Sequence, residues 1–201
     1  MKTFANAISY IFHPLFIPIA GTLAYFLITP KYSPLEIQSG NVLPIFILTV
    51  IIPIIAFFIL KNLGIVTSVH MASISERKYP LFIHIVLLLM ILYKVLPNNY
   101  IGELYFYFVG LIGSACANLL LVFTNYKASL HMAGIGGLFM YLINLSIHFE
   151  INVIIAISLF SLAVGVVASS RLYLKAHSKP ELFIGLCIGI LSQLLTVKFW
   201  L

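Results

Sequence analysis

The segment from Ser170 to Glu181 contains the residues of this chain best suited to chemistry. It places an imidazole, His177, and a carboxylate, Glu181, among three cations, Arg171, Lys175 and Lys179, and it lies between two long apolar runs. A guanidinium group binds phosphate oxygens in a bidentate manner, and an imidazole can serve as a nucleophile or as a general acid. This combination of side chains favours phosphate chemistry.

Two other polar clusters carry the same residue types. The first holds Arg77 and Lys78 with His70 before them, and the second holds Ser129 and His131. Each has a simpler interpretation when taken alone. Basic residues are common at membrane interfaces, and Ser129 has the position of a helix cap in front of His131.

The composition identifies the environment in which these clusters must work. Of the 201 residues 62% are apolar and 8% are charged, which is too few charges to cover a water-soluble domain of this size. The sequence therefore predicts an integral membrane protein. The net charge of +6 includes no basic run typical of nucleic-acid binding, so we expect no nucleic-acid partner.

The chain contains seven apolar runs, and a helix of about 20 residues spans the roughly 30 Å hydrocarbon core of a bilayer. Backbone polar groups inside lipid must be satisfied within the segment, so each run should be a helix. The sequence predicts one all-α transmembrane domain over 1–201, a bundle of six to seven helices. The runs are 8–28, 42–60, 80–97, 102–123, 131–148, 151–170 and 181–199.

The first run is the least regular, because Pro14 and Pro18 interrupt it and His13 lies within it. It is expected to kink or to lie partly in the interface. Small residues recur at four-residue spacing in later runs, which indicates close helix packing, with a homodimer as the alternative. These pairs are Ala133/Gly137, Gly165/Ser169 and Gly185/Gly189.

Counting the spans brings the three polar clusters together. They follow the second, fourth and sixth runs, and even-numbered loops share one face of the membrane. We therefore expect two arginines, Arg77 and Arg171, and two histidines, His131 and His177, to lie near one another beside the lipid. The chain has no Asp and no two Glu residues close together, which disfavours a magnesium site. We expect no metal and no cofactor.

The spacing of the third cluster resembles a signature motif of the type 2 phosphatidic acid phosphatase superfamily. That motif reads Ser-Arg, five residues, His, three residues, Asp, and here it is Ser170-Arg171, His177 and Glu181. The second motif, Pro-Ser-Gly-His, is present as Ala128-Ser129-Leu130-His131. The first, Lys, six residues, Arg-Pro, is degenerate, since Arg77 is followed by Lys78-Tyr79-Pro80 and His70 stands at the lysine position.

The resemblance covers about 42–199 and implies roles for individual residues. His177 would form a phosphohistidine, His131 would protonate the leaving oxygen, and Glu181 would hold the tautomer of His177. Arg171 and Arg77 would bind phosphate with Ser129, and Lys78 or His70 would replace the missing lysine. Ser178-Lys179-Pro180-Glu181 also reads as a capping box that begins the last helix.

Two functions remain open at this stage. One is a metal-independent phosphatase for a phosphorylated lipid, such as phosphatidate, phosphatidylglycerophosphate, a polyprenyl diphosphate or a lipid A phosphate. The other is a non-catalytic relative that binds or translocates phospholipid headgroups or serves as a partner subunit. The resemblance implies a bacterial inner membrane with a periplasmic site, whereas most Lys and Arg residues lie on the site face, which the positive-inside rule places in the cytoplasm.

Overall fold

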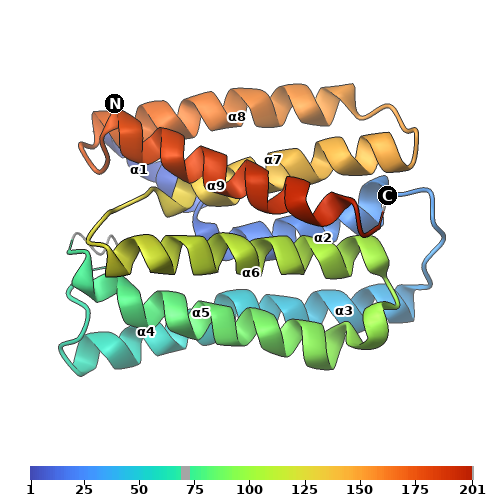
Figure 1. Ribbon diagram of the computed structural model, residues 1–201, viewed down its shortest axis with the longest axis horizontal. Coiled ribbons are helices and arrows are strands. Elements are labelled where there is room, and N and C mark those ends of the chain that lie inside the picture. Colours follow the sequence, from blue (N-terminus) through green and yellow to red (C-terminus); the bar gives the residue numbers. More distant parts are fainter. Residues whose placement is uncertain (69–72, 201) are drawn as a thin grey trace.

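The computed structural model describes residues 1–68 and 73–200, and these residues contain helices and no strand. The helices run alongside one another in a bundle (Figure 1). The α-helices are α1 (Lys2–Ile11), α2 (Ile17–Ile28), α3 (Leu35–Phe46), α4 (Ile52–Asn62), α5 (Lys78–Met90), α6 (Gly102–Phe123), α7 (Leu130–His148), α8 (Ile154–Tyr173) and α9 (Lys179–Val197). Short 3₁₀ segments are η1 (Pro14–Phe16), η3 (Ser75–Arg77) and η5 (Pro97–Asn99), and π-helical segments are η2 (Ile47–Ile51) and η4 (Ile91–Val95).

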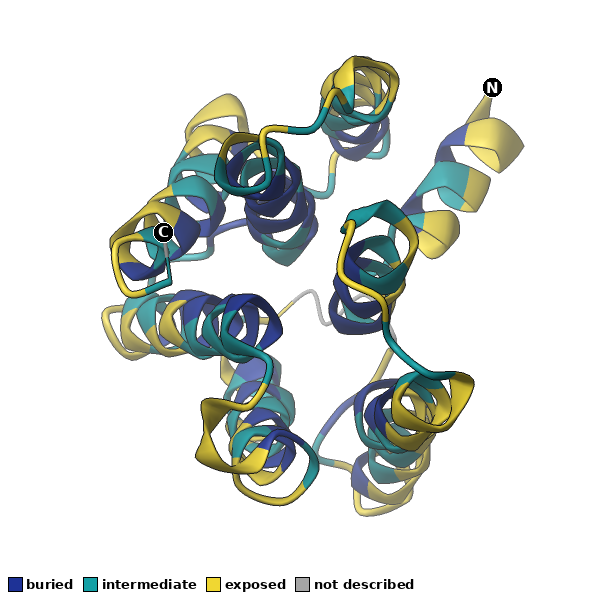
Figure 2. Cartoon of the chain, turned by 90° about the vertical axis from the view of Figure 1, so that its right-hand side faces the viewer, coloured by how far each residue is buried: buried dark blue, intermediate teal, exposed yellow. Residues whose placement is uncertain are grey.

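These elements form seven helical segments long and apolar enough to cross a membrane. They are Lys2–Ile28, Leu35–Asn62, Ser75–Val95, Gly102–Phe123, Leu130–His148, Ile154–Tyr173 and Lys179–Val197. The prediction of an all-α membrane bundle is confirmed. The protein is an integral membrane protein, and Figure 2 shows its exposed residues on the outside of the bundle and its buried residues facing inward.

The first span is divided into two helices, as its prolines predict. α1 ends at Ile11, and η1 begins after His13, whose Nδ1 accepts a hydrogen bond from the backbone N–H of Leu15 at 3.3 Å. Pro14 has no N–H group to continue the hydrogen bonds of α1. The break lets α1 pack against α8, while α2 packs against α3, α6 and α7.

The polar loops gather at one end of the bundle. The α4–α5, α6–α7 and α8–α9 connections lie at the same end as the N-terminus, and the C-terminus lies at the opposite end (Figure 1). The convergence expected from counting spans is therefore present in the fold.

Close contact between α7 and α9 fixes two of these loops relative to each other. A Cβ atom on Gly185 would lie 2.4 Å from the carbonyl oxygen of Ser129, and one on Gly189 would lie 2.1 Å from that of Ala133. Only glycine permits this approach at either position. Two of the three small-residue pairs thus pack inside one chain, whereas a Cβ on Gly165 of α8 would meet nothing within 4 Å.

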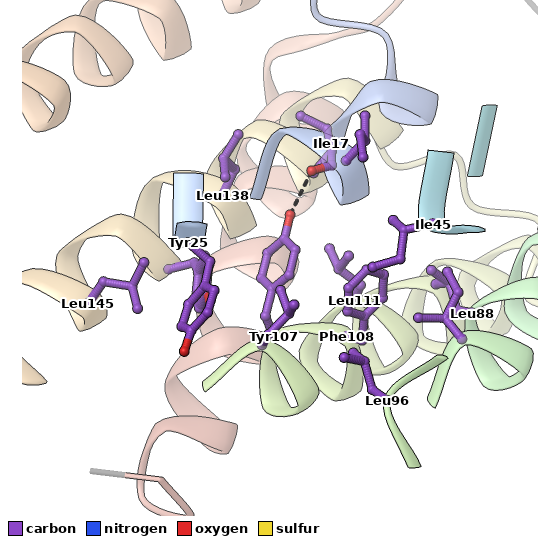
Figure 3. Close-up of a cluster of buried hydrophobic side chains, with 14 of the residues drawn as sticks. Ile17, Tyr25, Ile45, Leu88, Leu96, Tyr107, Phe108, Leu111, Leu138 and Leu145 are labelled. Carbon is purple, nitrogen blue, oxygen red and sulfur yellow. Dashed lines mark hydrogen bonds between the residues drawn. The ribbon is translucent and has the colours of Figure 1, made fainter. Parts of the chain in front are cut away.

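The largest apolar core lies deeper in the bundle, around Tyr107 of α6 (Figure 3). Tyr107 is fully buried, stacks on Tyr141 with ring centroids 4.2 Å apart, and donates a hydrogen bond from its hydroxyl to the carbonyl oxygen of Ile17 at 2.7 Å. This bond ties the start of α2 to α6. It also holds the break between α1 and α2 close to this core.

Candidate active site

The end of α8 determines where His177 lies. The N–H of Ala176 bonds to the carbonyl of Arg171 at 3.0 Å, and the N–H of Lys175 bonds to the carbonyl of Leu172 at 2.9 Å. With Lys175 in the left-handed conformation, at φ 52°, these bonds form a Schellman motif. The chain therefore turns sharply at Lys175, after α8 ends, and brings His177 back toward the bundle.

His177 is held by the residue that the resemblance implied for this role. Its Nδ1 lies 2.6 Å from Oε2 of Glu181, in the first turn of α9. A carboxylate accepts the Nδ1 proton, so Nε2 of a neutral His177 carries a lone pair. The capping-box alternative is not formed, because Ser178 occupies the N-cap position without a side-chain capping bond and Glu181 bonds to His177.

Arg171 is buried and has no carboxylate partner among the described residues. Its side chain is 3% exposed, its Nη1 donates to the hydroxyl oxygen of Ser9 at 3.2 Å, and its Nε has no hydrogen-bond partner. A buried charge is costly unless it is paired. Arg171 is therefore placed to bind an anion.

Arg77 enters the same region from the start of α5. It is 6% exposed, and its Nη1 donates to the carbonyl of Ala128 at 3.1 Å, which links it to the α6–α7 loop. Lys78 points elsewhere, with its Nζ 5.4 Å from the centre of the Phe123 ring. The structure thus brings Arg77 to Arg171 and His177 around one cavity, and Lys78 is not among the residues that line it.

His131 lies in the first turn of α7, close to the beginning of the chain. Its Nε2 is 3.0 Å from the backbone carbonyl of Ser9. Ser129 begins this helix as its cap, with its hydroxyl accepting from the N–H of Met132 at 3.4 Å, and its own N–H donates to the carbonyl of Glu181 at 3.0 Å. Ser129 is fully buried and positions α7 against α9, away from the lining of the cavity.

A cavity of about 310 Å³ is lined by several of these side chains and by residues of the neighbouring helices. Its polar end is formed by His13, Arg77, His131, Arg171 and His177. The remainder is mostly apolar and extends between α2, α4, α5 and α6, with a lining that includes Ile17, Pro18, Pro53, Ile54, Ala56, Phe57, Phe58, Leu60, Leu81, Ile83, Leu111, Ala115 and Leu130. Ile54 and Phe58 are also exposed, as expected for a cavity that opens toward the membrane.

The electrostatics of the cavity favour an anion and a neutral His177. Burial lowers the pKa of His177 to about 4, the hydrogen bond to Glu181 opposes this shift, and the charges of Arg77, Lys127 and Arg171 lower the pKa further. Nε2 of His177 is therefore unprotonated at neutral pH. The opposite end of the bundle differs, because its buried carboxylate, Glu103, is paired with Lys31 and lies 3.3 Å from His148.

Several residues at the site were not singled out by their spacing. Ser9 bonds both His131 and Arg171, and His13 and His84 line the cavity. His13 interrupts an apolar run, and this pattern could have identified it as a site residue. Nothing in the sequence distinguishes Ser9 in the same way. The predicted ligand His70 lies outside the described residues, and within those residues no three His, Cys, Asp or Glu side chains group closely enough to hold a metal ion.

Comparison of the chain with protein-family models, curated proteins and solved structures found no match. Fold and site together define the class: a helical integral membrane protein with a cationic, histidine-containing cavity at one end of its bundle. The cavity reaches beyond the predicted core of 42–199, since Ser9 and His13 of the first span belong to it.

Proposed function

We propose that this protein is a metal-independent membrane phosphatase that hydrolyses a phosphorylated lipid through a phosphohistidine at His177. One observation carries the proposal. Arg171, buried and without a carboxylate partner among the described residues, lines the same cavity as His177, whose Nδ1 is held by Glu181 and whose Nε2 is left as a lone pair. Cationic hydrogen-bond donors next to an oriented nucleophile are what phosphoryl transfer requires.

In the first step the Nε2 lone pair of His177 attacks phosphorus. A P–N bond forms, the P–O bond to the lipid breaks, and the electron pair of that bond leaves with the lipid oxygen. The guanidinium groups of Arg77 and Arg171 stabilise the charge that develops on the remaining phosphate oxygens. Glu181 stabilises the positive charge that His177 gains, because it accepts the Nδ1 proton in a hydrogen bond of 2.6 Å.

The leaving oxygen needs a proton, and His131 is the candidate donor on the other side of the cavity. Its Nε2–H is used by the carbonyl of Ser9, so the transferred proton must come from Nδ1 of the cationic ring. An anionic phosphate nearby favours that cation. In the second step water attacks phosphorus, the P–N bond breaks, His131 takes up the proton, and inorganic phosphate and neutral His177 are released.

The apolar part of the cavity supports a lipid rather than a soluble phosphoester. Cavities of this volume bury an apolar ligand with a few polar groups that fix its orientation. Here the polar groups lie in or near the loops at one end of the bundle, and the other lining residues are mostly apolar side chains of the helices. A lipid chain can enter between the helices while its phosphate remains near Arg77 and Arg171.

The resemblance of the Ser170–Glu181 segment to the type 2 phosphatidic acid phosphatase motif supports the same chemistry. By that resemblance we place the protein in a bacterial inner membrane.

The test is phosphate release from lipid phosphates by purified protein in detergent with EDTA present. The wild type should release inorganic phosphate, and His177→Ala should reduce release to background because no nucleophile remains. His148→Gln, a histidine change at the opposite end of the bundle, is the matched control and should remain active. If the wild type binds lipid phosphates without releasing phosphate, the protein is a headgroup-binding relative and the phosphatase proposal is wrong.

A further inference from the structure

His84 is a polar side chain in a mostly apolar part of the cavity. It lies on α5 seven residues after Arg77, which places the two residues on one helix face and about 10 Å apart along the helix axis. Both residues line the cavity. Arg77 is at the phosphate end and His84 is two turns deeper in the membrane.

His84 forms no hydrogen bond with any residue in the described ranges 1–68 and 73–200. Most residues that line this part of the cavity are apolar, among them Phe57, Leu81 and Leu111. A polar group in such surroundings costs free energy unless it finds a partner. The phosphatase mechanism gives His84 no role.

A second polar side chain lines the same part of the cavity. Asn118 of α6 is 3% exposed and donates from Nδ2 to the carbonyl of Ser114 at 2.8 Å. The second hydrogen of Nδ2 is donated to no described residue, so the amide keeps a donor for a ligand, and α6 packs directly against α5. The wall therefore offers an imidazole and an amide in a part of the cavity that is otherwise mostly apolar.

We infer that His84 and Asn118 form a subsite for a polar linkage group in the lipid, so that the substrate is a lipid phosphate whose chains are joined through esters. This inference rests on the proposed function and narrows its substrate class. A neutral imidazole has one N–H donor, which an ester carbonyl can accept. A polyprenyl phosphate has no such acceptor beyond its phosphate and would leave His84 unpaired.

The geometry of an ester-linked lipid fits the spacing. With phosphate at the Arg77 end, the ester groups begin several bonds farther along the molecule, toward the apolar end of the cavity. Arg77 and His84 lie two helical turns apart. A hydrogen bond of about 3 Å from Arg77 to the phosphate and another from His84 to the ester group account for the remaining distance. A site built to bond such a group rejects the analogue that lacks it, because the buried donor is then left without a partner.

The test uses two lipids that differ only in their carbonyl groups: dioleoyl phosphatidate and its dialkyl ether analogue, with farnesyl phosphate as a third substrate. The wild type should prefer the ester over the ether by about three- to tenfold in kcat/KM, as the loss of one buried hydrogen bond predicts. His84→Leu should bring the ratio close to one, mainly by slowing the ester. His84→Gln retains a donor and should retain part of the preference.

The control variant is Phe57→Leu, which changes an apolar wall residue of α4 and should affect both lipids equally. If the wild type hydrolyses both lipids with a ratio near one, or if His84→Leu leaves the ratio unchanged, this inference is overturned while the phosphatase proposal stands. A preference for farnesyl phosphate also overturns it. If no lipid phosphate is hydrolysed, the proposed function itself fails, and that result is distinct from an unchanged ratio.

Discussion

The backbone carbonyl of Ser9 lies 3.0 Å from Nε2 of His131, and the hydroxyl oxygen of the same residue accepts a hydrogen bond from Arg171 at 3.2 Å. A carbonyl only accepts hydrogen bonds, so Nε2 of His131 carries a proton and Nδ1 is the atom left for chemistry. One residue of α1 thus orients an imidazole of α7 and a guanidinium of α8. The first span is a part of the site, although it resembles no motif.

The first prediction concerns His131. Its replacement by Ala should lower kcat for lipid phosphate hydrolysis by about 10²–10⁴-fold, the usual contribution of a general acid. The neighbouring change Met132→Leu conserves volume inside α7 and should cost little activity. Steady-state phosphate release checks both variants, and full activity in His131→Ala would remove His131 from the mechanism.

The second prediction separates phosphate binding by Arg171 from a topological charge. Lys keeps the charge but cannot provide the planar bidentate fork, so Arg171→Lys should lose most activity while membrane insertion is unchanged. Lys175→Arg is the matched control, because Lys175 is exposed and outside the cavity lining, and it should be silent. Equal, full activity of the two variants would mean that Arg171 only sets topology.

The third prediction concerns the carboxylate that holds His177. Glu181→Gln keeps the size of the side chain but removes the charge that stabilises a cationic His177, so activity should fall at least about tenfold, a barrier increase of about 1.4 kcal/mol. Glu181→Asp restores the charge and should retain more activity than Gln. Thermal unfolding of the three proteins should be similar, and a fully active Gln variant would assign Glu181 a structural role alone.

The fourth prediction is the titration of His177 itself. Its pKa is lowered to about 4, chiefly by burial, from an ordinary value near 6.5, so the ring should remain neutral from pH 8 to pH 5. Nuclear magnetic resonance of ¹³C-labelled histidine in detergent, with His177→Ala to assign the signal, measures this directly. A midpoint near 6.5 would contradict the burial of the ring in the folded protein.

The lowered pKa of His177 also makes the stability of the folded protein depend on pH. Between about pH 4 and 6.5 the unfolded chain binds a proton at His177 that the folded chain does not. The free energy of unfolding therefore has its full value above pH 6.5 and falls as the pH is lowered toward 4. His177→Ala should show a weaker loss of stability over this interval than the wild type. Glu181→Gln should lower the pKa of His177 further, since the hydrogen bond to Glu181 raises it.

The sequence by itself determined the class of fold and the end of the bundle at which the polar residues meet. A segment inside lipid must satisfy its own backbone hydrogen bonds and is therefore a helix. The apolar runs accordingly predicted six to seven spans, and alternate loops then had to share a face. The contact of His177 with Glu181 was implied by the resemblance, and it is local, because only three residues separate the two side chains.

Only the tertiary structure decided which side chains enter the cavity. Apolar spans that are hydrophobic on nearly every face carry little information about how each helix is rotated, and close packing at residues such as Gly185 and Gly189 sets that rotation. Lys78 was therefore expected at the phosphate but lies over Phe123, and Ser129 was expected there but packs against α9. Ser9 and His84 reach the cavity for the same physical reason: the position of a side chain around a buried helix depends on contacts with distant parts of the chain.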